Sequence, residues 1–409
     1  MPCRDLTRRP STTSMPHRTI RHLDLQGKRV FMRVDFNVPL EADGLTITSD
    51  TRIRAALPTV EAVLDSGASL ILASHLGRPK GRPNPTMSLK PVAARLSELL
   101  GRPVALASDC VGDEVTEQAR SLAPGNVLLL ENLRFHAGEE KNDPEFARAL
   151  AALCDTYVND AFGAAHRAHA STAGIVEYVA EAASGLLMER ELKYLAMALR
   201  EPAHPYIAII GGAKISGKID VIRNLLDIAD RVLIGGAMTY TFLKSQGVPV
   251  GDSLVENEKL DLAADLLKTT GNQLLLPQDH VVAPDLAADV PTQTVDGADD
   301  LIPEHWKALD IGPATVAAYS EEISEAKMIV WNGPMGAFEV EPFATGTIAV
   351  AKAVASSGAT SIVGGGDSEK AIQIAGVADS ITHISTGGGA SLEFLAGKTL
   401  PGVAALETT

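Results

Sequence analysis

The stretch Ile207-Ala-Ile-Ile-Gly-Gly-Ala-Lys214 decides the fold of this 409-residue chain. Its opening apolar run suits a strand that is buried on both faces, as in a parallel sheet covered by helices. The two glycines that follow suit a loop whose backbone N–H groups reach phosphate oxygens without a side chain in the way. Apolar runs that end in polar or glycine-rich loops recur along the chain, with helical segments between them. This alternation predicts an α/β fold.

The chain is too long for one ordinary core, so we expect two domains. The predicted architecture is two Rossmann-like three-layer α/β/α lobes with mostly parallel sheets, joined by a hinge helix at Glu181–Leu199. A disordered extension is expected over residues 1–16, an N-terminal lobe over 17–184, and the hinge helix with a C-terminal lobe over 185–394. Strands are expected at Arg29–Asp35, Ser69–Ser74, Val127–Glu131, Thr156–Asn159, Tyr206–Ile210, Arg231–Ile234, Met328–Trp331 and Ser361–Val363.

Charge and composition exclude several classes of partner. The formal net charge of −15 argues against nucleic acid and anionic membranes. No apolar stretch is long enough to span a bilayer, and the N-terminus lacks the apolar core of a secretory signal. Cys3, Cys110 and Cys154 show no metal-ligand spacing and indicate reduced thiols. The sequence therefore predicts a cytoplasmic protein.

Single arginines occupy short polar loops in the N-terminal half. The forked guanidinium group suits a small substrate with several negative charges. One such arginine is usually a surface residue, but several at successive strand ends, where open α/β sheets bind ligands, indicate a substrate site. The arginines are Arg33, Arg52, Arg78, Arg134 and Arg167.

The glycine-rich loops of the C-terminal half predict a nucleotide site. Gly212–Ile219 comes within one residue of a P-loop, but Ile219 replaces the hydroxyl that would hold Mg²⁺, so a P-loop NTPase is not expected. Lys214 and Lys218 are four apart, so they would share one face of a helix that begins here and contact phosphates. An alternative is an ordinary solvated lysine pair.

An acidic residue follows another of these loops. Asp367 in Gly364-Gly-Gly-Asp-Ser368 would repel a phosphate unless a cation lay between them, and Mg²⁺ carried by the nucleotide is the natural candidate. The loop Asn332–Glu339 suits a base and ribose, with Glu339 accepting hydrogen bonds from ribose hydroxyls. A nucleotide in one half and a small anion in the other suggest phosphoryl transfer.

Eight stretches in order resemble the phosphoglycerate kinase family, from about Arg21 to Leu406. The resemblance implies a monomer that transfers a phosphoryl group reversibly, 1,3-bisphosphoglycerate + ADP ⇌ 3-phosphoglycerate + ATP. Transfer would be direct, in line and Mg²⁺-dependent, after hinge closure, with a C-terminal tail, 395–409, packed on the N-terminal lobe. The matching stretches are Arg33–Pro39, Ser74–Gly81, Glu131–Phe135, Tyr157–Gly163 with His166–His169, Gly211–Lys214, Trp331–Pro334, Gly364–Ser368 and Ser385–Glu393.

The resemblance also implies residue roles. The substrate-binding residues would be Asp35, Phe36, Asn37, Arg52, His75, Leu76, Gly77, Arg78, Arg134 and Arg167. The nucleotide-binding residues would be Gly212, Ala213, Lys214, Lys218, Gly236, Gly312, Asn332, Pro334, Glu339, Gly365, Gly366, Asp367 and Ser368, with Asp367 contacting the metal of Mg-ATP or Mg-ADP. The groups that stabilise the transferred charge would be Arg52, Lys214, Gly387, Gly388 and Gly389.

The sequence departs from the family pattern at two glycine or alanine positions in the C-terminal half. Gly217 replaces a polar residue and would loosen the following helix start, and Ala237 replaces a glycine and would crowd the base pocket.

A nicotinamide-dependent oxidoreductase would need a G-x-G-x-x-G turn, which opens no βαβ unit here. A non-catalytic sensor of sugar phosphates and nucleotides is the alternative, but it has no need of Lys214, Asp367 and Glu339 together.

Overall fold

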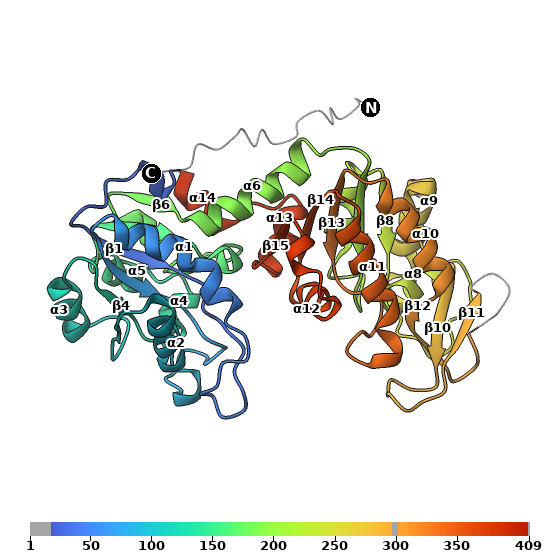
Figure 1. Ribbon diagram of the computed structural model, residues 1–409, viewed down its shortest axis with the longest axis horizontal. Coiled ribbons are helices and arrows are strands. Elements are labelled where there is room, and N and C mark those ends of the chain that lie inside the picture. The colour runs from blue at the N-terminus through green and yellow to red at the C-terminus, as the bar shows by residue number, and fades with distance from the viewer. Residues whose placement is uncertain (1–17, 297–301, 408–409) are drawn as a thin grey trace. The chain divides into compact units, whose positions relative to one another are not determined.

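The computed structural model describes residues 18–296 and 302–407, so the expected extension over residues 1–16 lies outside the described residues. The chain divides into two compact units (Figure 1). The first comprises Met1–Arg190 and Leu400–Thr409, and the second comprises Glu191–Thr399. Within the described ranges, no helix has the length and apolar character needed to cross a membrane.

The first unit is built on a six-stranded parallel sheet in the order β3-β4-β2-β1-β5-β6. Apolar clusters cover both faces, because Val30 and Met32 on β1 belong to one cluster and Phe31 between them belongs to the other. The strands are β1 (Arg29–Arg33), β2 (Ser69–Ala73), β3 (Val104–Leu106), β4 (Val127–Leu129), β5 (Thr156–Asn159) and β6 (Ala182–Ser184). The helices are α1 (Thr51–Asp65), α2 (Lys90–Leu100), α3 (Asp113–Ser121), α4 (Ala137–Glu140), α5 (Pro144–Ala151) and α14 (Pro401–Ala404).

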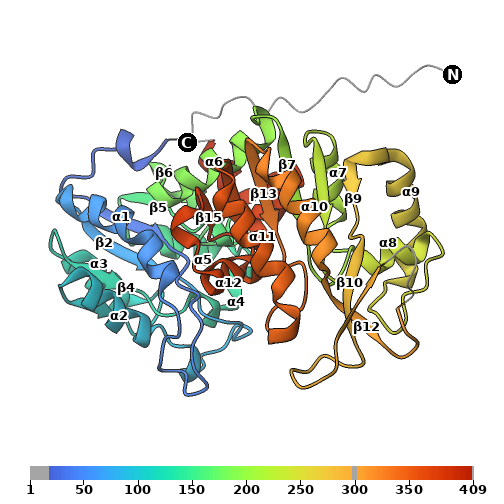
Figure 2. The same ribbon diagram turned by 45° about the vertical axis from the view of Figure 1, so that its right-hand side comes forward.

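The second unit has a six-stranded parallel sheet in the order β15-β14-β13-β7-β8-β9. A smaller antiparallel sheet, β11-β10-β12, lies at one end of this unit (Figures 1 and 2). The strands are β7 (Tyr206–Ile210), β8 (Arg231–Ile234), β9 (Leu274–Leu275), β10 (Asp279–Ala283), β11 (Gln293–Asp296), β12 (Lys307–Ile311), β13 (Met328–Asn332), β14 (Thr360–Gly364) and β15 (His383–Ser385). The helices are α7 (Ile219–Leu226), α8 (Thr239–Ser245), α9 (Leu260–Thr270), α10 (Pro313–Ser324), α11 (Thr345–Ser356), α12 (Gly366–Ala375) and α13 (Gly389–Leu395).

The predicted fold class is confirmed, and each expected strand is present within two residues of its expected ends. The helix expected at Glu181–Leu199 is wrong at its start, because residues 182–184 form β6 and the helix, α6, spans Leu186–Arg200. The Asp160 carboxylate explains this start, since it accepts a hydrogen bond of 3.0 Å from the backbone N–H of Met188. This cap comes from 28 residues away, so the local periodicity could not reveal it.

Candidate active site

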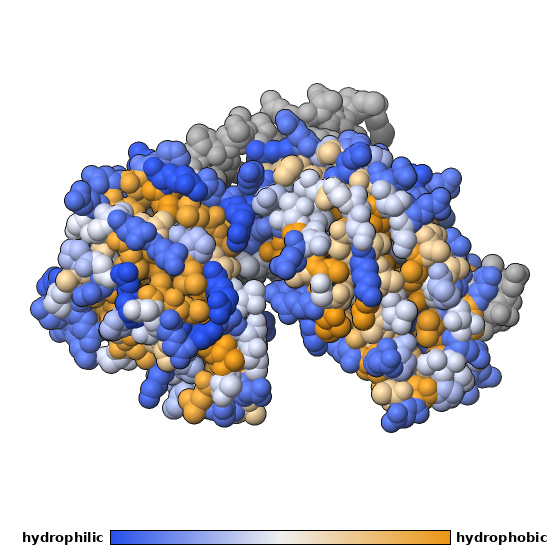
Figure 3. Space-filling model, in the orientation of Figure 1, coloured by the Kyte–Doolittle hydropathy of each residue, from blue (hydrophilic) through white to orange (hydrophobic). Residues whose placement is uncertain are grey.

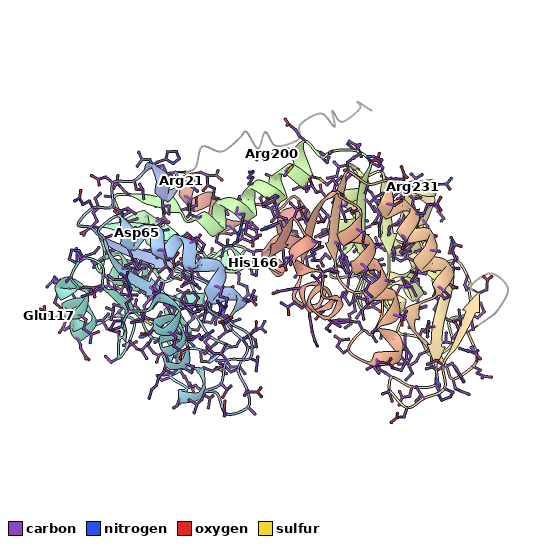
Figure 4. The ribbon with its side chains drawn as sticks, in the orientation of Figure 1. Arg21, Asp65, Glu117, His166, Arg200 and Arg231 are labelled. Atoms are coloured by element: carbon purple, nitrogen blue, oxygen red, sulfur yellow. The ribbon has the colours of Figure 1, made fainter. Side chains whose placement is uncertain are left out.

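The residues expected to bind substrate follow the carboxyl ends of neighbouring strands in the first unit. Asp35 follows β1, His75 follows β2, and Arg134 lies in η3 (Leu133–Phe135) after β4. Arg167 lies in the loop after β5, beside His166, which is labelled in Figure 4. Because β1, β2, β4 and β5 run parallel, these loops share one edge of the sheet.

Hydrogen bonds link five of the expected substrate residues. The Arg52 guanidinium on α1 lies 3.3 Å from the Asp35 carboxylate and donates to the Asn37 carbonyl at 3.0 Å. The Asn37 side-chain oxygen accepts the Gly77 N–H at 2.8 Å. The Gly77 carbonyl in turn accepts a hydrogen bond of 2.8 Å from Arg134. The chain therefore fixes two arginines around one loop. The Phe36 and Leu76 side chains, by contrast, are buried in an apolar cluster of the core.

The electrostatics of this cluster favour an anion. Burial acts to raise the pKa of Asp35, but the positive charges of Arg52 and Arg33 and the Asn37 N–H contribute to lowering it, and the net shift is downward. Burial lowers the pKa of His75 well below its ordinary value, so this imidazole is neutral near pH 7. Burial also lowers the pKa of Arg134, and the charges of Arg33 and Arg167 add to that effect. Positive charges that oppose one another in this way would be relieved by a bound anion.

Two further arginines have exposed side chains that are available to a ligand. Arg78 and Arg167 are both exposed, and neither forms an ion pair within residues 18–296 and 302–407. A free guanidinium group can donate in a forked geometry to a phosphate or a carboxylate. These two side chains are therefore available to a ligand at the same strand ends.

The prediction that Arg33 and Arg52 lie in polar loops is wrong, and Arg52 is in the first turn of α1. Arg33 is the last residue of β1 and is fully buried. Its Nε donates to the Ser171 hydroxyl at 2.8 Å, and its Nη2 lies 3.9 Å from the buried Glu139 carboxylate. Glu139 also accepts the Ser171 N–H at 3.0 Å and its hydroxyl at 2.6 Å. Arg33 therefore forms a buried ion pair with Glu139, and its Nη2 lies 3.2 Å from the Nδ1 of the expected substrate residue His75.

Sequence reasoning missed Glu139. Burial raises the pKa of this carboxyl, although the charge of Arg33 and the bonds from Ser171 oppose the rise. Its neighbour Glu140 is half-exposed, with 43% of its side chain accessible. Nothing in the local sequence separates one glutamate from the next, so only tertiary packing identifies Glu139 as the buried partner.

In the second unit, three glycine loops pack backbone against backbone. The Gly211 N–H donates to the Asn332 carbonyl at 3.0 Å, and the Gly236 N–H donates to the Met335 carbonyl at 2.8 Å. A Cβ atom on Gly211 would collide with the Pro334 carbonyl, and one on Gly236, where φ is +70°, would collide with Gly212. These glycines are required by close packing as well as by any phosphate contact.

A lysine, an asparagine and a glycine tie the loops after β7, β13 and β14 together. The Lys218 ammonium donates to the Asn332 side-chain oxygen, and the Asn332 side-chain nitrogen donates to the Gly364 carbonyl at 2.8 Å. Burial lowers the pKa of Lys218 to about 8, against the opposing charge of Asp367. The Ser368 hydroxyl accepts the Gly333 N–H at 2.7 Å. Lys218 is partly buried, and no carboxylate of the described residues forms an ion pair with it, so its ammonium is suited to an incoming phosphate.

The prediction that Lys214 and Lys218 share a helical face is wrong. The helix α7 begins at Ile219, so both lysines precede it, and Lys214 is exposed in the loop. The Lys218 N–H instead closes a turn on the Ile215 carbonyl at 2.8 Å. Because of the Gly-Gly turn and Gly217, the helix begins later than the spacing of the two lysines predicted.

The remaining expected nucleotide residues lie along the same unit. Asp367 is exposed in the first turn of α12, after Gly365 with a φ of +98°. Gly387 and Gly388 lie between β15 and α13, and Gly389 is the first residue of α13; β15 is next to β14 in the sheet. Gly312 begins α10 with its backbone against the Asp279 carboxylate. Glu339 is exposed and forms no ion pair with the part of the chain that the structure describes.

The structure accommodates Gly217 and Ala237, the two departures from the family pattern. A Cβ atom on Gly217 would meet nothing within 4 Å, and the residue does not need a positive φ. Ala237 is partly buried against the apolar cluster that contains Tyr240 and Val250. Its methyl group therefore contributes to packing in this cluster.

We expect Gly217→Ala to raise the free energy of unfolding by about 0.4–1 kcal/mol, because alanine restricts the unfolded chain at a site where the native backbone accepts it. Denaturant unfolding of the two proteins measures the difference. Gly236→Ala is the matched control and is expected to destabilise, since its φ is positive and its neighbour is backbone. Destabilisation by Gly217→Ala would show that the turn needs glycine.

Comparisons with known proteins agree on one family. The family model described as phosphoglycerate kinase matches residues 20–398. A phosphoglycerate kinase of Solibacter usitatus is 65% identical over 396 residues, which cover 96% of this chain and 100% of that protein. One of Acidobacterium capsulatum is 61% identical and covers 95% and 98% of the two chains. The solved structure of phosphoglycerate kinase from Coxiella burnetii matches with a TM-score of 0.86 and 41% identity over 96% of this chain and 99% of that chain.

Proposed function

Because the chain belongs to the phosphoglycerate kinase family, we propose that its two units divide the two substrates of that reaction. The enzyme transfers a phosphoryl group reversibly between ATP and the carboxylate of 3-phosphoglycerate. The first unit would bind 3-phosphoglycerate or 1,3-bisphosphoglycerate, and the second would bind ATP or ADP. The observation that carries this division is the arginine cluster in one unit and the glycine loops around Lys218 in the other.

The chemistry needs charge stabilisation more than proton transfer. The acceptor carboxylate has an ordinary pKa near 4, so it is already ionised at pH 7 and needs no general base. The buried, neutral His75 is consistent with this. Arg52, the exposed Lys214 and the N–H groups of Gly387–Gly389 would stabilise the charge on the transferred group. Direct in-line transfer also requires a hinge closure that brings donor and acceptor together and excludes water.

The residues of the second unit fit Mg²⁺ carried by the nucleotide. Asp367 is exposed at the start of α12, and its negative charge already acts on the Lys218 ammonium. A single carboxylate suits a metal whose other ligands are phosphate oxygens and water. When bound, the metal would neutralise charge on the phosphate oxygens.

We also propose, from the family resemblance, that the chain works as a monomer in the cytoplasm. Among the described residues, the large apolar side chains that are exposed are Leu45, Leu254, Leu286 and Ile374. In Figure 3, apolar residues form areas on the drawn face of both units that are bordered by hydrophilic residues.

Calorimetry tests whether the two ligands occupy separate sites. We expect 3-phosphoglycerate to bind one site per chain in the presence of saturating Mg-ADP. Loss of 3-phosphoglycerate binding through competition with Mg-ADP would contradict the division of substrates between the units.

The affinity for Mg-ADP is expected to fall about tenfold between pH 7 and pH 9. Free Lys218 loses its proton with a pKa of about 8, and a phosphate binds its protonated form, so binding above pH 8 must also take up a proton. Calorimetry across this range measures the fall. Lys218→Arg is the matched control, because a guanidinium stays protonated and the pH dependence should vanish. The same slope in both proteins would assign the dependence to another group.

A further inference from the structure

A carboxylate, a thiol and an imidazole meet in the first unit, and the phosphoryl-transfer chemistry does not use them. Asp109 and Cys110 lie between β3 and α3, and His136 follows η3. One ligand atom from each of the three side chains lies within 4.8 Å of the others. The His136 Nε2 is 2.5 Å from the Asp109 Oδ1. The sequence could not show this arrangement, because His136 is 26 positions from Cys110.

The surroundings of the thiol favour a cation. Cys110 is fully buried, and its Sγ donates to the Glu131 carbonyl at 2.9 Å. The carboxylates of Asp109, Glu131 and Glu139 are close enough to act electrostatically on this thiol. A divalent ion would be attracted to these negative charges; it would stabilise the thiolate, and the thiol proton would leave to solvent.

The donor set selects the class of ion. Thiolate and imidazole together suit Zn²⁺ or Co²⁺, whereas Mg²⁺ and Ca²⁺ prefer oxygen ligands alone. Tetrahedral bonds of about 2.0–2.3 Å place ligand atoms roughly 3.3–3.8 Å apart, so the Asp109–His136 contact would have to open by about 1 Å. Asp109 is 46% exposed, whereas His136 is 31% exposed and its ring stacks on Phe146, so the opening would come mainly from Asp109. The exposure of both side chains gives an ion a path from solvent.

We propose that Asp109, Cys110 and His136 form a binding site for a divalent ion of the zinc class, with solvent at the fourth position. The ion would join the segment before α3 to the segment after η3. Arg134, two residues before His136, contacts the Gly77 carbonyl, so the proposed site lies next to a substrate-binding loop without sharing its residues. The site does not depend on the assignment of substrates to the units.

Cobalt and zinc titrations of the untagged full chain test the proposal. A Cys3→Ser background, stripped with chelator and free of nucleotide, removes the thiol that lies outside the described residues. We expect one Co²⁺ per chain with a thiolate-to-cobalt charge-transfer band, one Zn²⁺ by calorimetry, and a higher Tm with Zn²⁺. Cys110→Ser should abolish the band, and Asp109→Asn and His136→Gln should each weaken Zn²⁺ binding by at least about tenfold.

The controls separate the site from general effects. Cys154→Ser removes the other described thiol and should leave the band and the Zn²⁺ affinity unchanged. Asp109→Asn and His136→Gln change partly exposed side chains, and circular dichroism verifies that each variant is folded. Absence of Zn²⁺ binding to the parent, or equal affinity in the parent and all three ligand variants, would overturn the proposal and leave Asp109 and His136 as an ordinary ion pair.

Discussion

Arg52→Ala is expected to lower kcat by roughly 100-fold or more, the scale of removing one preorganised donor to a transition state. The Arg52 guanidinium is held by Asp35 and by the Asn37 carbonyl, so its position is fixed before substrate binds. About a third of the side chain remains exposed, at 35%, which leaves donors for a ligand. A group held in this way stabilises developing charge without having to reorganise during the reaction.

Arg54→Ala is the matched control for this variant. Arg54 lies on the same helix, but its side chain is 54% exposed and pairs with Asp50 at 2.9 Å. Its loss should leave kcat unchanged, since an exposed ion pair contributes little. Steady-state kinetics with 3-phosphoglycerate separate the effects. An Arg52→Ala enzyme with normal kcat and only a raised KM would assign Arg52 to substrate binding alone.

Asp367→Ala is expected to lower kcat/KM for Mg-ATP by on the order of 100-fold, while 3-phosphoglycerate binding stays intact. Without this carboxylate, the start of α12 presents only its N–H groups to the metal–nucleotide complex. The Lys218 ammonium also loses the negative charge that favours its protonated form. Both changes act in the second unit, so the arginine cluster should be unaffected.

Asp379→Ala is the control for charge alone. Asp379 is exposed in η9 (Ala378–Ser380), and its removal changes the net charge of the chain by the same amount. Calorimetry with Mg-ADP and with 3-phosphoglycerate compares the two variants. Normal Mg-ADP affinity in Asp367→Ala would contradict the proposed metal contact.

The sequence predicted features whose signal is local. The apolar run at Ile207–Ile210 became β7, and the arginines at strand ends led to the cluster around Gly77. The start of α6 was predicted wrongly because it depends on Asp160, which is distant in the sequence. The position of Arg33 was predicted wrongly because its buried partner, Glu139, is also distant in the sequence.

Side-chain contacts between residues far apart in the sequence could not be predicted either. Lys218 meets Asn332 across 114 residues, and no spacing rule connects them. The antiparallel sheet of β10–β12 was missed, since short strands of mixed polarity such as Gln293–Asp296 carry little periodic signal. Residue types therefore indicated the chemistry of the site, but the partners that fix each side chain required the fold.

The most direct test of the account is a coupled assay. The chain is supplied with ATP, Mg²⁺ and 3-phosphoglycerate, and 1,3-bisphosphoglycerate is detected as NADH oxidation by an added dehydrogenase. The account predicts turnover that EDTA abolishes and excess Mg²⁺ restores. No turnover, from a chain that binds both 3-phosphoglycerate and Mg-ADP in calorimetry, would contradict it and favour a non-catalytic sensor.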